Sequence, residues 1–159
     1  MKNQQHILLK ELYEEFSGDI YRYAFSLLRD EEEAKDSVHE VFLRYFKNVD
    51  SFRGDCSNKT WLFTITRNYC FDRLKNKNFN HPKIDDPDIN DTYQPDFEMK
   101  ISLNDACKKL NEEENELIFL RDYAGYSYKE IAELTGYSRD NIKIKLFRAK
   151  QKLLKFLSE

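Results

Sequence analysis

The chain has 159 residues, of which 40% are hydrophobic and 35% charged, and its formal net charge is −3 at pH 7. This length fits one mid-sized domain or two small ones, and 12 Phe with 10 Tyr are too many for a disordered chain. Only four glycines and three prolines are present, which disfavours a turn-rich all-β architecture. The composition therefore predicts a helical protein with a modest core.

The sequence also limits the compartment and the chemistry. Its start, MKNQQHILLKEL, has no apolar core of the signal-peptide type, and no stretch approaches the ~20 apolar residues that span a bilayer. We therefore expect a cytoplasmic protein that is not inserted in a membrane. Cys56, Cys70 and Cys107 are widely spaced, and the three histidines do not complete a zinc-ligand pattern. Free thiols, no metal and no cofactor are expected.

Charge is unevenly distributed along the chain. Residues 138–157 carry seven Lys/Arg against Asp140 alone, and residues 53–77 carry six against two Asp. Residues 30–40 have the opposite sign, with six acidic residues against Lys35. A single charge run is usually a solvated helix face. Two basic segments and one acidic segment together indicate separate contacts with a polyanion and with a protein.

Apolar residues recur at helical spacing in the first half of the chain. They predict helices over residues 8–29, from Asp30 onward, and from about Thr60 to Lys75, which together form a domain over residues 1–78. Asp30 with Glu33 is typical of a helix N-terminus. The apolar side of the second helix is expected to hold Ala34, Val38, Val41, Phe42, Tyr45 and Phe46. That of the third is expected to hold Trp61, Leu62, Ile65 and Tyr69.

The character of the sequence changes after the third helix. Residues 79–97 contain all three prolines and no helical stripe, so they are expected to form a flexible acidic linker. The second small domain is then residues 98–159, beginning with a short helix over 98–110. The acidic clusters at 30–33 and 112–116 are both interpreted as first turns of helices, where carboxylates suit the helix dipole.

Helix boundaries in the second domain follow from its capping residues. Asn111 is a good N-cap, Ser127 with Glu130 forms a capping box, and Ser138 caps the last helix. Gly125 and Gly136 end the helices that precede them. A short helix, a Gly-containing turn and a longer helix make a helix-turn-helix, a common DNA-binding arrangement.

The last helix has two distinct sides. Its buried stripe is expected to be Ile142, Leu146, Ala149 and Leu153. Its outward side is expected to present Asp140, Asn141, Lys143, Ile144, Phe147, Arg148, Gln151 and Lys155. Basic and amide side chains on such a face reach phosphates and base edges in the major groove. Ile144 and Phe147, apolar on this side, either contact thymine methyls and sugars or pack against a neighbouring helix or protein partner.

Both halves together resemble a known family, the bacterial RNA polymerase sigma factors of the short extracytoplasmic-function type. The segment SYKEIAELTGYSRDNIKIKLFRAKQKL resembles region 4 of the family, which binds the promoter −35 element. The segment DEEEAKDSVHEVFLRYFKNVDSFRGDCSNKTWLFTITRNYCFDRLK resembles region 2, which holds the polymerase clamp and opens the −10 element. The order of the two motifs and the linker between them extend the resemblance over nearly the whole chain.

The resemblance implies polymerase contacts on the second helix. Asp36, Glu40 and Arg44 match positions that meet the clamp of the large polymerase subunit, and His39 replaces the Gln of a Gln-Glu pair that the family usually has. Region 4 is implied to contact the flap of the second large subunit. An anti-sigma factor is a further partner that the resemblance implies.

The resemblance also places the −10 contacts. The loop from Arg53 to Lys59, which includes Asn58, matches the segment that captures a flipped base, a step in which unstacking costs a few kcal/mol. Asn68 and Lys75 match the ends of an N-x-x-x-D-x-x-R motif, with Lys in place of Arg, and Asn68 is the better candidate for a base contact. The −10 set is completed by two arginines suited to phosphate, Arg67 and Arg73.

The −35 contacts are implied on the last helix, with Lys143, Phe147 and Arg148 at matching positions and Arg139 near its start. Asn141 and Ile144 replace the Thr and Ser usual there, and the loss of a hydroxyl at Ile144 predicts a different or more T-rich −35 element.

Other functions make different predictions. A stand-alone helix-turn-helix regulator would bind its operator tightly without polymerase, whereas a sigma factor would bind weakly on its own. An enzyme would need convergent metal-binding carboxylates or a nucleophile–base pair, and no such order stands out. The leading interpretation is therefore a sigma factor without catalytic chemistry of its own.

Overall fold

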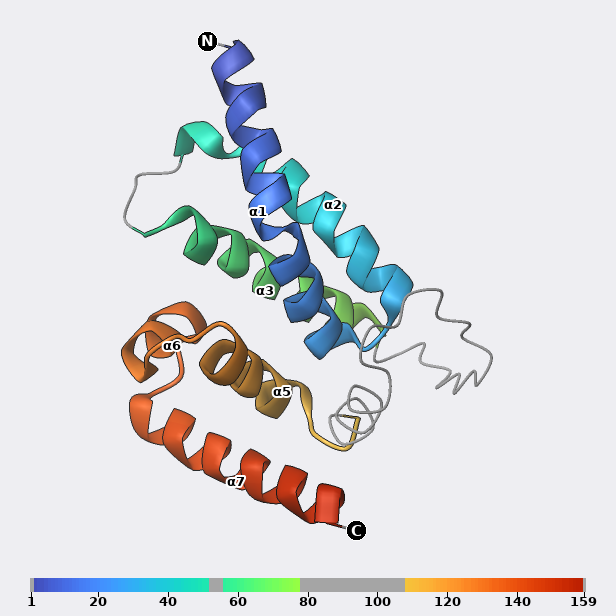
Figure 1. Ribbon diagram of the computed structural model, residues 1–159, viewed down its shortest axis with the longest axis vertical. Coiled ribbons are helices and arrows are strands. Elements are labelled where there is room, and N and C mark those ends of the chain that lie inside the picture. The colour runs from blue at the N-terminus through green and yellow to red at the C-terminus, as the bar shows by residue number, and fades with distance from the viewer. Residues whose placement is uncertain (1, 52–55, 78–107, 159) are drawn as a thin grey trace.

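A computed structural model describes residues 2–51, 56–77 and 108–158, and these form two groups of helices (Figure 1). No strand occurs in these three segments, so the all-α fold with two small helical domains is confirmed. The expected linker over 79–97 and most of the expected helix over 98–110 lie outside the described residues.

The N-terminal group consists of α1 (Lys2–Leu28), α2 (Glu31–Lys47), the 3₁₀ turn η1 (Val49–Ser51) and α3 (Asn58–Lys77). The three long helices all pack against one another. Helix α2 begins where the sequence predicts, because an Asp30 side-chain oxygen accepts a hydrogen bond from the Glu33 N–H at 3.0 Å. The core between the helices includes Ile20, Tyr23, Ala24, Leu27, Ala34, Val38, Val41, Leu62 and Phe63.

The C-terminal group consists of α5 (Glu112–Ile118), a π-helical turn η2 (Phe119–Tyr123), α6 (Tyr128–Thr135) and α7 (Arg139–Ser158). Its expected caps are confirmed. Asn111 and Ser127 each form a complete capping box with the glutamate three residues on, and the Ser138 hydroxyl accepts from the Asn141 N–H. Gly136 ends α6 with a φ of 82°, a left-handed conformation that side-chain-bearing residues rarely adopt.

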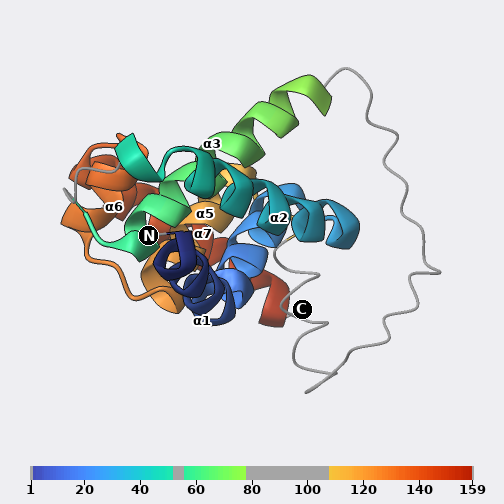
Figure 2. The same ribbon diagram turned by 90° about the horizontal axis from the view of Figure 1, so that it is seen from above.

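The two groups pack directly against each other. Helix α5 contacts α1 on one side and α7 on the other, and α7 lies on the far side of α5 from the N-terminal helices (Figure 1; Figure 2 gives the view from above). Aromatic rings fill the junction: Tyr23 stacks on Phe119 with centroids 4.9 Å apart, and Phe63 lies 5.9 Å from Tyr126. The helix-turn-helix is thus held against the N-terminal domain through α5, η2 and the turn that precedes α6.

Two expectations about the apolar stripes need correction. On α2, Phe46 is 41% exposed rather than buried, because it follows the buried Tyr45 directly and one residue turns the helix by about 100°. On α3, Trp61, Ile65 and Tyr69 are only half-buried. The fully buried side chains there are Leu62, Phe63, Thr66 and Cys70. Helix α3 faces both the N-terminal core and the C-terminal group, and a single-stripe pattern does not describe such a helix.

Candidate nucleic-acid interface

The last helix presents the outward face that the sequence predicts. Ile142, Leu146 and Ala149 are buried against α5 and α6, whereas all six predicted −35 residues are exposed: Arg139, Asn141, Lys143, Ile144, Phe147 and Arg148. Phe147 is 63% exposed, a high value for a phenylalanine. A helix whose apolar residues lie on two sides has one side for the core and one for a partner.

The basic residues of α7 fall into two groups, one in ion pairs with neighbouring elements and one on the outward side. Lys145 Nζ lies 2.7 Å from Glu113, Lys152 Nζ 3.0 Å from Glu114, and Lys150 Nζ 3.2 Å from Asp122. These three lysines therefore bind acidic side chains of α5 and η2. Arg139, Lys143, Arg148 and Lys155 lie on the outward side. These acids of α5 and η2 hold α7 in place and neutralise the flank that faces them, whereas the outward side keeps its four basic residues.

Six of the seven predicted −10 residues lie on α3, and their exposure and contacts differ from one to the next. Asn68 and Lys75 are exposed at the surface, and Asn58 is half-buried, where its side-chain oxygen accepts from the Tyr45 hydroxyl at 3.2 Å. Arg73 Nη2 donates to Glu33 at 2.9 Å across to α2. Arg53 lies outside the described residues.

Two other predicted −10 residues face the C-terminal group. Lys59 Nζ lies 5.7 Å from the Phe63 ring centroid and 5.5 Å from that of Tyr126. Arg67 Nε donates to Glu116 Oε2 on α5 at 2.7 Å, and its Nη2 donates to the Tyr137 hydroxyl at 3.1 Å. The Arg67 side chain is 17% exposed, so it is largely enclosed by these contacts.

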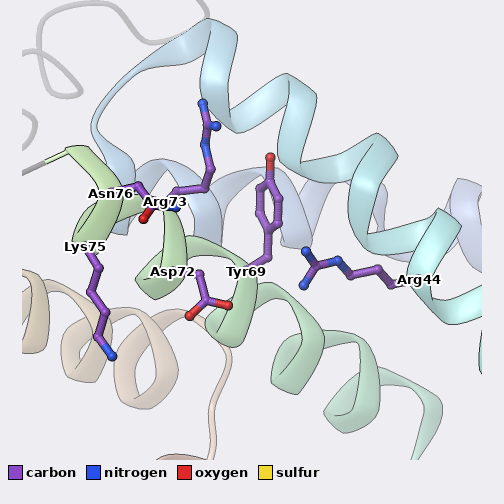
Figure 3. A pocket seen from close by; sticks show the side chains of 6 residues that line it. All are labelled: Arg44, Tyr69, Asp72, Arg73, Lys75 and Asn76. Atoms are coloured by element: carbon purple, nitrogen blue, oxygen red, sulfur yellow. The ribbon is translucent and has the colours of Figure 1, made fainter. Parts of the chain in front are cut away.

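A shallow pocket of about 330 Å³ lies between α2 and α3, and its lining residues are shown in Figure 3. They are Arg44, Tyr69, Asp72, Arg73, Lys75 and Asn76. The Arg44 guanidinium lies 5.0 Å from the Tyr69 ring centroid, a cation–π distance. This pocket brings Arg44, predicted to contact polymerase, next to two residues predicted to contact the −10 element.

The predicted clamp-binding residues lie along the outer side of α2. Asp36 and His39 are exposed, and Glu40 accepts from Arg44 Nε at 3.2 Å, one helical turn away. Sequence reasoning missed the apolar part of this face, where Leu43 is 54% exposed and Phe46 is exposed beside it. The sequence spacing could have predicted it, because Leu43 and Phe46 recur at helical spacing with His39 and Glu40, on the side of α2 opposite the buried stripe.

A second missed feature is a buried polar cluster between the domains. Tyr23 on α1 and Glu116 on α5 are both 0% exposed, and the tyrosine hydroxyl donates to Glu116 Oε2 at 2.5 Å. Burial raises the pKa of Glu116, although Arg67 and the Tyr23 hydroxyl act to lower it. Burial and the neighbouring Glu116 also raise the pKa of Tyr23 well above its usual range. The sequence predicts that Glu116 lies in the acidic first turn of α5 with its neighbours at 112–114. In the structure it lies beyond that turn and is buried between the domains.

Within the described segments, no group of three or more His, Cys, Asp or Glu side chains is placed to hold a metal ion. None of the helices over those segments is long and apolar enough to cross a bilayer.

Two family models match this chain. Residues 12–79 match the model for sigma-70 region 2, and residues 101–153 match that for sigma-70 region 4. Among related proteins, the RNA polymerase sigma factor YlaC of Bacillus subtilis is 28% identical over 171 residues, covering 100% of this chain and 96% of its own. The ECF RNA polymerase sigma factor SigM of the same organism is 29% identical, covering 91% and 92%.

Solved structures show the same fold. The sigma factor RpoE of Bartonella quintana, solved in complex with the anti-sigma factor NepR, superposes with a TM-score of 0.79 at 23% identity, covering 94% of this chain and 96% of that one. CnrH, solved with the cytosolic domain of CnrY, superposes with a TM-score of 0.70 at 21% identity, covering 94% and 87%.

The fold, the two region matches and the exposed faces define a DNA-binding transcription factor built from two helical modules. The chain belongs to the sigma-70 family of RNA polymerase sigma factors, and to its extracytoplasmic-function type. It directs core RNA polymerase to promoters, and its partners are core polymerase and promoter DNA.

Proposed function

We propose that three sets of residues of this sigma factor share the work of promoter recognition. The outer face of α2, with Asp36, His39, Glu40 and Arg44, binds the polymerase clamp. The polar side of α3 and the loop before it, with Arg53, Asn58, Lys59, Arg67, Asn68, Arg73 and Lys75, bind the −10 element. The outer face of α7, with Arg139, Asn141, Lys143, Ile144, Phe147 and Arg148, reads the −35 element.

The observation that carries this proposal is the outer face of α7. It is basic and exposed, although the opposite side of the same helix is buried and the flanking lysines are bound to acids of α5 and η2. Among residues 108–158, no ion pair joins a carboxylate to Arg139, Lys143 or Arg148, and positive side chains of this kind are available for phosphates. Exposed apolar groups beside them are available for thymine methyls.

The remaining assignments follow from this division. The protein has no catalytic chemistry of its own, and the polymerase that it recruits makes the RNA. It acts in the cytoplasm, where core polymerase works. A protein inhibitor of the anti-sigma class is a further partner, because RpoE and CnrH, which share the fold, were solved with NepR and with the cytosolic domain of CnrY.

The test is run-off transcription with purified core polymerase and a pool of genomic promoters. The wild-type protein is expected to yield a specific set of transcripts. Arg148→Ala is expected to weaken that set, because it removes a cation from the −35 face without touching the core. Lys129→Ala, an exposed lysine on α6, is the matched control and is expected to leave transcription unchanged. Absence of transcripts, together with tight DNA binding without polymerase, would favour a stand-alone regulator.

A further inference from the structure

The carboxylate of Glu116 occupies a position that a DNA phosphate could take. Arg67 Nε donates to Glu116 Oε2 at 2.7 Å, and the guanidinium packs between the rings of Phe71 and Tyr137, 4.7 and 5.3 Å from their centroids. Arginine binds a carboxylate and a phosphate through the same N–H groups. While this pair is formed, Arg67 cannot bind the −10 backbone.

Neighbouring contacts hold the same junction. The Thr60 and Tyr126 hydroxyls are hydrogen-bonded at 3.0 Å, and Lys59 lies against the Tyr126 ring. Directly after α1, Arg29 Nη1 donates to the Lys108 carbonyl at 2.9 Å and Nη2 to that of Leu110. Two residues of the proposed −10 set, Lys59 and Arg67, are therefore engaged by the C-terminal domain.

The −35 face is not affected by this packing. Helix α7 lies on the far side of α5 from α1, and its outward residues are exposed in the same conformation that encloses Arg67 (Figure 1). The closed arrangement is therefore asymmetric. It occupies part of the −10 surface and leaves the −35 surface free.

The Arg67–Glu116 ion pair is incompletely hydrogen-bonded, which favours its opening. Glu116 Oε1 is buried without a hydrogen-bond partner in the described residues, so the carboxylate is only partly satisfied. Taking two charges out of water is unfavourable, and an incompletely bonded pair recovers only part of that cost. Opening the junction returns Arg67 and Glu116 to water, and a phosphate can then replace Glu116.

We propose that Glu116 is an internal competitor of the −10 element, which holds the free protein closed through Arg67 and Tyr23 until −10 DNA takes the arginine. The proposal rests on the assignment of Arg67 to the −10 surface. It implies an order of events, in which the closed protein can bind the −35 element and must open before it binds the −10 element. The apparent −10 affinity is then the affinity of the open protein multiplied by the fraction of molecules that are open.

The test compares Glu116→Gln with wild type in two measurements. Small-angle X-ray scattering of the free protein reports whether the domains separate. Fluorescence anisotropy reports binding to a forked DNA that carries the −10 element of a promoter recovered by transcription, and to a duplex that carries only its −35 element. We expect Glu116→Gln to expand the protein and tighten −10 binding by about tenfold, because removing one partner leaves an uncompensated charge in the closed state. The −35 affinity should not change.

Three further variants test whether the effects of Glu116→Gln come from the loss of its contacts with Arg67 and Tyr23. Glu113→Gln is the same substitution on the same helix, but Glu113 pairs with Lys145 inside the C-terminal domain, so it should change neither measurement. Arg67→Ala should expand the protein without tightening −10 binding, because the cation itself is lost. Tyr23→Phe removes only the hydroxyl that bonds Glu116 and should act in the same direction as Glu116→Gln, which covers the case in which Gln at 116 prevents folding.

The proposal is overturned if Glu116→Gln and Tyr23→Phe leave either the scattering or the −10 affinity as in wild type, or if Glu113→Gln has the same effects. The proposed function has a separate failure, the absence of promoter-specific transcripts with wild-type protein. In that case the scattering comparison still decides whether Glu116 closes the chain.

Discussion

Arg67 and Glu116, 49 residues apart in the sequence, are joined by a 2.7 Å ion pair between the two promoter-binding domains. The Tyr23 hydroxyl donates to the same carboxylate oxygen, so one buried oxygen connects α1, α3 and α5. The relative placement of the two domains is consequently fixed by a few polar contacts inside an aromatic junction. A buried ion pair of this kind adds little net stability, because the cost of removing its charges from water offsets their attraction.

The capping box of α6 gives a prediction about pH. Hydrogen bonds from Ser127, first from its backbone N–H, lower the pKa of Glu130 below its usual 4.5. A lowered carboxyl pKa stabilises the fold above the unfolded pKa, and this contribution is lost as pH falls through the folded value. Glu130→Gln keeps an acceptor but not the charge. We expect the difference in melting temperature between wild type and this variant to vanish as pH falls from 5 towards 3.

Glu133→Gln, exposed on the same helix outside the capping box, is the control for the loss of a surface carboxylate. Ser127→Ala removes the cap itself and should cost about 1 kcal/mol of unfolding free energy at pH 7. A wild-type-to-Gln difference that persists at pH 3 would show that the charge of Glu130 contributes nothing to the cap.

The outer face of α2 gives a prediction about polymerase binding. Asp36→Arg reverses an exposed charge on the proposed clamp surface, so it should weaken binding to core polymerase by about tenfold or more while the melting temperature stays near that of wild type. Glu133→Arg makes the same reversal on the distant helix α6 and should leave binding unchanged. Both affinities are measured by titrating labelled core polymerase. Equal binding by the two variants would remove Asp36 from the clamp surface.

The sequence predicted the helices and caps well because these depend on local rules. The Asn111 and Ser127 capping boxes, the left-handed Gly136 and the two sides of α7 all follow from spacing within one or two turns. The exposed side of α7 could be predicted for the same reason.

The junction between the domains could not be predicted in this way. Glu116 follows Glu112, Glu113 and Glu114, and a run of acids at a helix start has the same pattern whether its last member is solvated or buried. Only tertiary packing distinguishes the two, through the approach of Tyr23 and Arg67 from other helices. The buried residues of α3 were predicted incorrectly for a related reason. This helix is packed on two sides, so Phe63 and Cys70 are buried although they lie outside the single apolar stripe that the spacing predicts.

The outward position of Ile144 gives a prediction about promoter choice. Its side chain is 49% exposed on the −35 face, where an apolar group favours thymine methyls and a hydroxyl would favour hydrogen-bonding base edges. Ile144→Ser should therefore shift preference away from T-rich −35 elements in run-off transcription from a library with a randomised −35 region. Leu157→Ser replaces an equally exposed residue of the same helix, also at 49%, and should leave preference unchanged. Identical preferences for wild type and Ile144→Ser would count against a base contact.

The buried thiol of Cys70 gives a last prediction, about reactivity. Burial raises the pKa of Cys70 from 9.0 to about 12, so its thiolate is scarce at pH 8, and the side chain is fully enclosed in the core. In a Cys56→Ser/Cys107→Ser protein, which leaves this thiol alone, a disulfide reagent should label only as fast as the chain unfolds, with a rate that rises with urea. The single variant Cys107→Ser should show one fast thiol, the exposed Cys56, and one slow one. Labelling of Cys70 in native buffer as fast as that of Cys56 would contradict its complete burial in the core.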